Sequence, residues 1–141
     1  YLKFSFPQPL NERTRLGAIL HKKAARKLTI SDRLWDSHQK RKQRNRDLGR
    51  GFGYSSFNRD AEYTSTISAR YYKDGSEILI EQKNKNPRML SPREAARLQG
   101  FPESFKIVVS NLQAYKQFGN SVSVPVIREI AKEMLSTLNI K

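Results

Sequence analysis

The chain has 141 residues, enough for one domain with a modest core, and its 27 Lys and Arg outnumber its 13 Asp and Glu to give a net charge of +14. It contains no cysteine, which excludes disulfides, thiolate metal sites and cysteine nucleophiles, and its two histidines, His21 and His38, are too few and too isolated for a zinc site. No apolar run is long enough to span a membrane and no signal-peptide pattern opens the sequence, so we expect a cytoplasmic protein with no membrane partner.

The positive charge is concentrated in the first 60 residues. Residues 1–60 hold 15 basic and 5 acidic residues, a net charge of +10, whereas residues 61–141 hold 12 and 8, a net charge of +4. A region this basic usually binds a polyanion, and binding to phosphates would be strongly salt dependent. A solvated surface, or a ribosomal or lipid partner, would fit the same composition, but the charge favours nucleic acid.

The first 30 residues contain few regular elements. Two prolines favour an extended strand end over residues 4–9, because proline disfavours helix in the residue before it. Residues 15–20 have the composition of a short helical turn, and a basic loop, residues 22–27, follows. The chain begins with Tyr1 rather than methionine, so we expect a fragment or a processed chain.

A helix with a basic far end is predicted next. Thr29 or Ser31 can cap it, Asp32 suits its first turn, and Gly49 suits its stop. Its apolar side would consist of Leu34, Trp35 and His38. The basic residues of its second half are candidate phosphate contacts: Lys40, Arg41, Lys42, Arg44 and Arg46. Positive charge also suits the carboxyl end of a helix dipole, but that role does not explain six basic residues between positions 40 and 50.

Residues 49–54 read as an irregular loop with three glycines in five residues, an open backbone that can approach another surface closely. Arg50, Phe52 and Tyr54 supply a forked donor and two flat rings. Arginine can bond a guanine edge through two hydrogen bonds, and aromatic rings can wedge or stack against bases. A glycine-rich turn with buried aromatics would have the same sequence.

A β-hairpin is predicted over residues 63–82. Residues 64–72 are rich in threonine, isoleucine and tyrosine, Asp74-Gly75 is a strong turn signal, and residues 78–80 form the return strand. A polar, basic linker over residues 82–88 would follow.

Two further helices are predicted after residue 90. Ser91 and Glu94 have the spacing of a capping box, Pro92 suits the first turn, and Gly100 suits the stop. The last helix starts beyond residues 119–121, is capped by a serine at 121 or 123, and has an apolar stripe from position 126 to 138. That stripe needs a surface to cover, either in this chain or in a missing partner.

Two segments carry a resemblance to a known family. Residues 88–102, RMLSPREAARLQGFP, resemble the ninth shared motif of the DNA (cytosine-5)-methyltransferases, and residues 114–122, AYKQFGNSV, resemble their tenth. Thr66-Ile67 is similar to the pair that ends the family's target-recognition region, and residues 4–9 are similar to the stretch that enters it. The resemblance therefore covers essentially the whole chain.

The resemblance implies an α+β fold in two parts. Residues 1–112 would form the small DNA-recognition domain, with a short antiparallel sheet and helices. Residues 113–141 would return to the large α/β domain that binds S-adenosylmethionine, and would end in a helix belonging to that domain.

The resemblance also implies site residues. Asn120, Ser121 and Val122 match positions that touch S-adenosylmethionine, and a tight turn at a helix amino end suits an anionic group, although Asn120 and Ser121 also suit helix capping. Thr66 matches a position on the DNA backbone near the extruded base, or is an ordinary strand threonine, and Arg70 is assigned to DNA with it. Three residues are expected to brace the recognition domain rather than perform chemistry: Arg93, Glu94 and Arg97.

No residue of this chain is expected to be catalytic. The family flips a cytosine out of double-stranded DNA, attacks it with a cysteine thiolate and assists the attack with a glutamate. Its Pro-Cys, Glu-Asn-Val and Phe-x-Gly-x-Gly motifs are all absent here. We therefore expect a missing N-terminal catalytic part, in the same chain or in the other subunit of a split enzyme, and the non-methionine start favours the same chain. The alternatives are a non-catalytic basic nucleic-acid-binding module and a regulatory or scaffold fragment.

Overall fold

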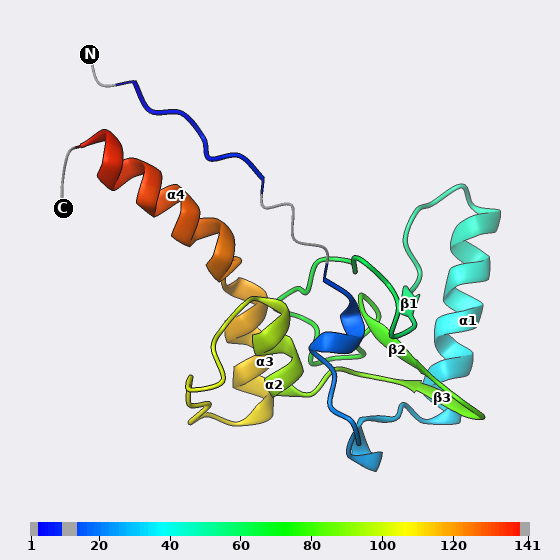
Figure 1. Ribbon diagram of the computed structural model, residues 1–141. Helices are drawn as coiled ribbons and strands as arrows, with labels where there is room; N and C mark the ends of the chain where they lie inside the picture. Colours follow the sequence, from blue (N-terminus) through cyan, green and yellow to red (C-terminus); the bar gives the residue numbers. More distant parts are fainter. Residues whose placement is uncertain (1–2, 10–13, 139–141) are drawn as a thin grey trace.

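The computed structural model describes residues 3–9 and 14–138. Within these residues the chain forms two 3-10 turns (Leu16–Ala18 and Arg26–Leu28), four α-helices and three short strands. Their order is α1 (Asp32–Asp47), β1 (Ser56–Phe57), β2 (Leu79–Gln82), β3 (Lys85–Arg88), α2 (Pro92–Leu98), α3 (Asn111–Asn120) and α4 (Val124–Thr137). Figure 1 shows α1 on one side of the sheet, α2 and α3 on the other, and α4 leaving this body next to residues 3–9. The α+β class expected from the sequence is confirmed.

Helix α1 forms where the sequence predicts it. The Ser31 hydroxyl caps it by accepting a hydrogen bond from the Leu34 N–H at 3.3 Å, and Gly49 follows its end with a φ of 61°. Its inward side buries His38 and half-buries Leu34 and Trp35. The outward side carries most of the basic run.

The predicted hairpin over residues 63–82 is wrong. Strand β2 pairs antiparallel with β3, through a turn at Asn84 with a φ of 55°, and parallel with β1, so the sheet is mixed. The segment predicted as a polar linker therefore forms β3. Residues 68–76 form turns instead, because Tyr71 is fully buried and its hydroxyl donates to the Ile78 carbonyl at 2.7 Å. Burial in the core here overrides strand propensity.

Helix α2 has the predicted capping box, in which the Ser91 hydroxyl accepts from the Glu94 N–H and the Glu94 carboxylate accepts from the Ser91 N–H. Gly100 follows its end with a φ of 79°. A Cβ at Gly100 would lie 2.3 Å from the Pro125 ring, so only glycine allows this approach of α2 to the start of α4.

Helix α3 is not foreseen by the sequence reading. It ends with Gly119 and Asn120, so the tight turn expected at a helix amino end is wrong: these residues close one helix, and residues 121–123 lead into the next. Ser123 takes the cap position of α4 without a side-chain cap bond, and Pro125 lies in its first turn as predicted. The division of the chain at residue 112 falls inside α3 and stays a prediction.

The hydrophobic core is built by residues 16–118 alone. It is formed by side chains around Tyr71, Ile78, Leu90, Ala96 and Phe118, with α3 packed against α2. Helix α4 contributes no buried residue. Among residues 3–9 and 14–138, no helix is long and apolar enough to cross a membrane.

Candidate nucleic-acid interface and cofactor segment

Side chains of α1 hold the loop of residues 49–54 in place by donating hydrogen bonds to its backbone carbonyls. Three successive loop carbonyls, those of Phe52, Gly53 and Tyr54, each accept from an α1 side chain. The donors are the Asn45 amide at 2.5 Å, the Arg41 guanidinium at 2.9 Å and the Lys42 ammonium at 3.3 Å, respectively. A Cβ on Gly53 would lie 2.6 Å from the Lys42 Cα, so glycine is required for this approach.

Arg41 makes two further contacts beneath the loop. Its Nη1 lies 3.1 Å from the Asp74 carboxylate, and its Nη2 lies 2.9 Å from His38 Nδ1. The other nitrogen of His38, Nε2, lies 3.1 Å from the Asp74 carbonyl oxygen, which can only accept. Nε2 therefore carries the proton and Nδ1 accepts from Arg41, which makes His38 a neutral imidazole.

The ionisation of these groups fits their contacts. Burial lowers the pKa of His38, and Arg41 lowers it too, while the contacts with Asp74 act in the opposite direction. Burial alone would raise the pKa of Asp74, but hydrogen bonds from Ser76 and Arg41 outweigh it and hold that pKa below its usual range. The cluster thus pairs one cation with one anion around a neutral histidine.

The residues predicted to bind DNA divide into two groups. Arg41, Lys42 and Tyr54 face the protein: Lys42 Nζ lies 4.2 Å from the centroid of the Tyr54 ring, which packs edge-on against Trp35. The exposed group is Lys40, Arg44, Arg46, Arg50, Phe52, Thr66 and Arg70. Lys40 in this group pairs with Asp36 at 2.8 Å. The outward surface of α1 and its loop is therefore basic, with one exposed aromatic ring, Phe52.

Glu94 is the centre of a buried polar cluster. It has no exposed surface and accepts two hydrogen bonds from Arg88 at 2.8 Å, one from the His21 N–H at 2.8 Å and one from the Ser91 N–H at 2.7 Å. Burial alone would raise the pKa of Glu94, but these bonds outweigh burial and lower it. The cluster joins β3, α2 and the segment near residue 21.

The other two residues predicted to brace the fold lie nearer the surface. Arg93 donates to the Phe105 carbonyl at 2.6 Å, and Arg97 pairs with Glu103 at 2.5 Å and donates to the Ile19 carbonyl at 3.0 Å. Hydrogen bonding to Glu103 raises the pKa of Arg97. These contacts tie α2 to the segments on either side of it.

The residues assigned to the cofactor, 120–122, lie between two hydrogen bonds made by Gln99, the residue that follows α2. The Gln99 amide donates to the Phe118 carbonyl and the Gln99 carbonyl accepts from the Val124 N–H, both at 2.8 Å. Between these bonds Asn120 and Val122 are exposed, and the Ser121 hydroxyl donates to the Phe118 carbonyl. An exposed amide beside an exposed apolar side chain fits one wall of a pocket for a part-polar cofactor.

Gly119 connects this segment to the predicted DNA-backbone residue. A Cβ on Gly119 would lie 2.2 Å from the backbone of Ser68, two residues after Thr66. Because only glycine permits this contact, the end of α3 and the segment around Thr66 are packed as one unit.

Several positioning residues were missed by sequence reasoning. Asp74 was assigned only to a turn, Arg88 and Gln99 were given no role, and two tyrosines were not recognised as polar core residues. The Tyr71 hydroxyl accepts from the Leu90 N–H at 2.7 Å, and the Tyr115 hydroxyl donates to the Leu90 carbonyl at 2.6 Å. Burial, with the nearby Glu94 charge, raises the pKa of Tyr115 to about 12. The usable signal was position: Arg88 and Gln99 lie inside the ninth-motif segment and Tyr115 inside the tenth.

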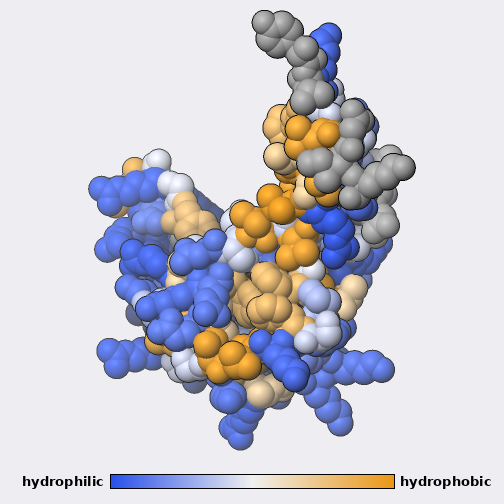
Figure 2. Space-filling model, turned by 90° about the vertical axis from the view of Figure 1, so that its left-hand side faces the viewer, coloured by the Kyte–Doolittle hydropathy of each residue, from blue (hydrophilic) through white to orange (hydrophobic). Residues whose placement is uncertain are grey.

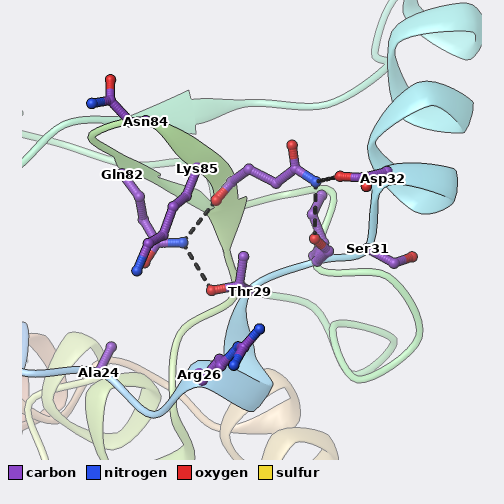
Figure 3. Close-up of a pocket in the computed structure, with 10 residues that line it drawn as sticks. Ala24, Arg26, Thr29, Ser31, Asp32, Gln82, Asn84 and Lys85 are labelled. Carbon is purple, nitrogen blue, oxygen red and sulfur yellow. Dashed lines mark hydrogen bonds between the residues drawn. The ribbon is translucent and has the colours of Figure 1, made fainter.

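A surface groove lies where α1 begins, between that helix and the β2–β3 hairpin (Figure 3). Gln82 donates to the Thr29 hydroxyl at 2.9 Å and to the Asn86 carbonyl at 2.7 Å. Asn86 in turn donates to the Asp32 carboxylate at 2.6 Å and to the Ile30 carbonyl at 3.2 Å. The amides of this groove hold α1 on the hairpin, which gives the basic helix a fixed base.

Comparisons with known proteins show the family to which this chain belongs. The family model "C-5 cytosine-specific DNA methylase" matches residues 1–136. The chain is 65% identical over 138 residues to the Type II methyltransferase M1.ScrFI of Lactococcus lactis subsp. cremoris, covering 98% of this chain and 36% of that protein. It is 62% identical over 136 residues to M.SsoII of Shigella sonnei, covering 96% and 36%.

A similar fold occurs in the Entamoeba histolytica methyltransferase EhMeth, with a TM-score of 0.77 at 18% identity, over 98% of this chain and 45% of that one. The chain spans little more than a third of the length of the two relatives above.

Proposed function

Because the chain belongs to the C-5 cytosine-specific DNA methylase family, we propose that it is the DNA-reading and C-terminal part of a DNA (cytosine-5)-methyltransferase of a restriction–modification system. The complete enzyme transfers a methyl group from S-adenosylmethionine to C5 of a cytosine flipped out of a specific duplex site. The observation that most supports this is the fixed loop of residues 49–54, which presents an exposed arginine and an exposed aromatic ring beside a basic helix. The chain alone is inactive, since it lacks the attacking cysteine.

Recognition is assigned to the exposed group of basic and aromatic residues. Arg50 reads a base edge in the major groove and Phe52 stacks or wedges beside it. Lys40, Arg44 and Arg46 bind phosphates, which positions the protein without specifying sequence. Thr66 and Arg70 lie exposed near the segment that Gly119 contacts, and bind the DNA backbone close to the extruded cytosine.

The cofactor is assigned to the segment that Gln99 brackets. Asn120 and Ser121 offer polar contacts and Val122 an apolar one to S-adenosylmethionine, which supplies the methyl group when bound. The rest of that pocket belongs to the N-terminal catalytic part, which also provides the cysteine and covers the apolar surface of α4. Arg93, Glu94 and Arg97 brace the recognition domain through the contacts described above, which tie α2 to β3 and to the segments near residues 19–21 and 103–105.

The apolar surface of α4 separates this function from a free-standing DNA-binding module. Figure 2 shows apolar side chains along the arm that α4 forms and down the centre of this face below it, with hydrophilic side chains mainly at the edges. Val126, Ile127, Met134, Leu135 and Leu138 are all about half exposed on this helix. A module that only binds DNA has no use for such a surface, whereas a fragment of a larger enzyme requires it.

The test is an Arg50→Ala substitution in the complete protein, followed by mapping of methylated cytosines in DNA exposed to it. A bidentate base contact contributes about 1–3 kcal/mol of discrimination, so methylation at sites that differ by one base pair should rise, relative to methylation at the target site, by roughly 5-fold or more. Lys85→Ala is the control, because it removes an exposed charge from the hairpin, outside the proposed interface. Unchanged site choice in the Arg50 variant would remove the loop from recognition.

A further inference from the structure

We propose that Arg41 is a specificity-positioning residue rather than a DNA contact: together with His38 and Asp74 it forms a latch that fixes the recognition loop on α1. The proposal rests on the proposed function, because it assumes that residues 49–54 read DNA. It reverses the expectation drawn from the basic run, in which Arg41 is one of five equivalent phosphate contacts.

Both terminal nitrogens of the Arg41 guanidinium are engaged within the protein. Nη1 bonds the Asp74 carboxylate at 3.1 Å, and Nη2 bonds the Gly53 carbonyl and His38 Nδ1, each at 2.9 Å. The Arg41 and Asp74 side chains are only about one-third exposed. These bonds use three of the five N–H donors of Arg41, whereas Arg44, on the same helix, is exposed.

The latch joins three segments that are far apart in sequence. His38 and Arg41 lie on α1, Gly53 lies in the recognition loop, and Asp74 lies 33 residues beyond Arg41 in the chain. Asp74 is itself held, because its carboxylate accepts from the Ser76 N–H at 3.1 Å and its carbonyl accepts from His38 Nε2. Arg41 therefore connects the loop, through Gly53, to the turn at Asp74.

The hydrogen bonds to the loop carbonyls indicate why Arg41 controls base recognition by the loop. Asn45 and Lys42 hold the carbonyls on either side of Gly53, but Arg41 holds the middle one and is the member of this set whose contacts reach the turn at Asp74. Gly53 lies three residues after Arg50 and one after Phe52. A bidentate base contact tolerates displacements of only about 0.5 Å, so loosening Gly53 removes the precision that discrimination needs.

The latch and a phosphate contact make opposite predictions for two substitutions that alter charge differently. Arg41→Lys keeps the positive charge but replaces the fork with a single ammonium, which cannot reach Gly53, His38 and Asp74 in the same geometry. Asp74→Asn removes a negative charge and so favours DNA binding if charge alone matters. In the latch, both substitutions loosen the loop.

The experiment uses the complete protein and its mapped target site. The ratio of methylation rates on the target duplex and on a duplex with one changed base pair is measured for wild type, Arg41→Lys, Arg41→Ala, Asp74→Asn and Arg50→Ala, with the salt dependence of DNA binding. We expect both latch variants to lose about 10-fold or more of this ratio while the slope of log affinity against log salt stays unchanged. Arg44→Ala is the matched control, and should lower that slope by about 0.9 and keep the ratio.

The ratio separates positioning from a loss of folded protein, because partial unfolding lowers both rates equally. Wild-type ratios in Arg41→Lys and Asp74→Asn, with a lower salt slope in Arg41→Ala, would overturn the latch and make Arg41 a phosphate contact. If Arg50→Ala also keeps the wild-type ratio, the proposed recognition role of the loop fails instead. If Arg50→Ala alone loses it, the loop reads DNA and the latch is wrong.

Discussion

The body of the molecule and the α4 arm differ in the side chains that they bury and expose. The body, residues 14–121, contains the whole buried core and turns the charged side of α1 outward. The arm, residues 3–9 and 124–138, buries no side chain in the core, and its aromatic and aliphatic side chains meet in a groove formed by Phe4, Phe6, Ile130, Met134 and Leu138. Figure 1 shows the two parts diverging from the end of α3.

This difference indicates which surface another part of the protein covers. Charged side chains are well solvated, so the outward side of α1 needs no cover. Exposed apolar surface costs about 25 cal/mol per Å², and an apolar patch on this scale marks a surface that another part of the protein covers. The arm is therefore one side of an interface.

The largest expected effect tests whether the body is held by its own contacts. Glu94→Ala leaves the Arg88 guanidinium, which is 4% exposed, without its carboxylate, and leaves the His21 and Ser91 N–H groups without an acceptor. Breaking a buried ion pair from one side costs about 3–5 kcal/mol. Thermal unfolding of the complete protein should show this loss, together with faster hydrogen exchange in α2.

Glu103→Ala is the matched control for this prediction. Glu103 also pairs with an arginine, Arg97, but its side chain is largely exposed, so water replaces the partner and the loss should be much smaller. Equal losses for the two variants would mean that burial of the Arg88–Glu94 pair contributes nothing, and that the body depends on other contacts.

The next effect tests the arm. Leu135 is 48% exposed in this chain, so Leu135→Asp should leave the stability of the body unchanged. In the complete protein, burying a leucine contributes about 1.5–3 kcal/mol, so the substitution should weaken S-adenosylmethionine binding and methylation by roughly 10-fold or more. Equilibrium binding of the cofactor measures this, and Ser136→Asp, at the neighbouring exposed position, is the control. Equal behaviour of the two variants would show that this side of α4 stays exposed.

A smaller effect is expected at the junction of the two parts. Gly119→Ala places a methyl group 2.2 Å from the Ser68 backbone, so α3 must shift, at a cost of about 1–3 kcal/mol. The shift should lower cofactor affinity as well as the melting temperature, because Gly119 adjoins Asn120. Gly51→Ala is the control, since a Cβ there meets no atom within 4 Å. A stability loss without a cofactor effect would separate this junction from the proposed cofactor segment.

The sequence predicted the elements whose causes are local. The caps at Ser31 and Ser91, the glycines after α1 and α2, and the proline at the start of α4 all act within a few residues, and the structure confirms them. The hairpin failed because burial of Tyr71 is a tertiary effect. Helix α3 was not predicted, although Ser110 caps it. Its last residues, Gly119 and Asn120, have the composition of a turn and were interpreted as one.

The basic surface of α1 was predictable from the sequence, but the contacts of its individual residues were not. Arg41 and Arg44 are indistinguishable in a run of basic residues, and only the structure shows that one faces Asp74 and the other solvent. The acceptors that decide this lie 12 and 33 residues away from Arg41, and no local pattern links them to it. Composition can place a basic surface, but which charges remain for DNA depends on contacts across the fold.

The smallest expected effect concerns the pH dependence of the loop. Burial lowers the pKa of His38 below its ordinary value of 6.5, so the folded body binds its proton less readily than the unfolded chain does. The stabilising contribution is therefore complete above pH 6.5 and declines as the pH falls below it, by no more than about 1.4 kcal/mol per pH unit. Protonation would also place a cation against Arg41 and remove the acceptor at Nδ1.

Hydrogen exchange of the Arg50 amide, which bonds the Asn45 carbonyl, reports this change between pH 5 and 7 once the intrinsic pH dependence of exchange is removed. His38→Asn cannot titrate in this range, so its exchange should lack the acid-side decline. Identical profiles for the two proteins would show that the proton on His38 is not coupled to the loop. The loop would then be held by the contacts of Arg41 with Asp74 and Gly53 alone, and its hydrogen exchange would not depend on the protonation of His38.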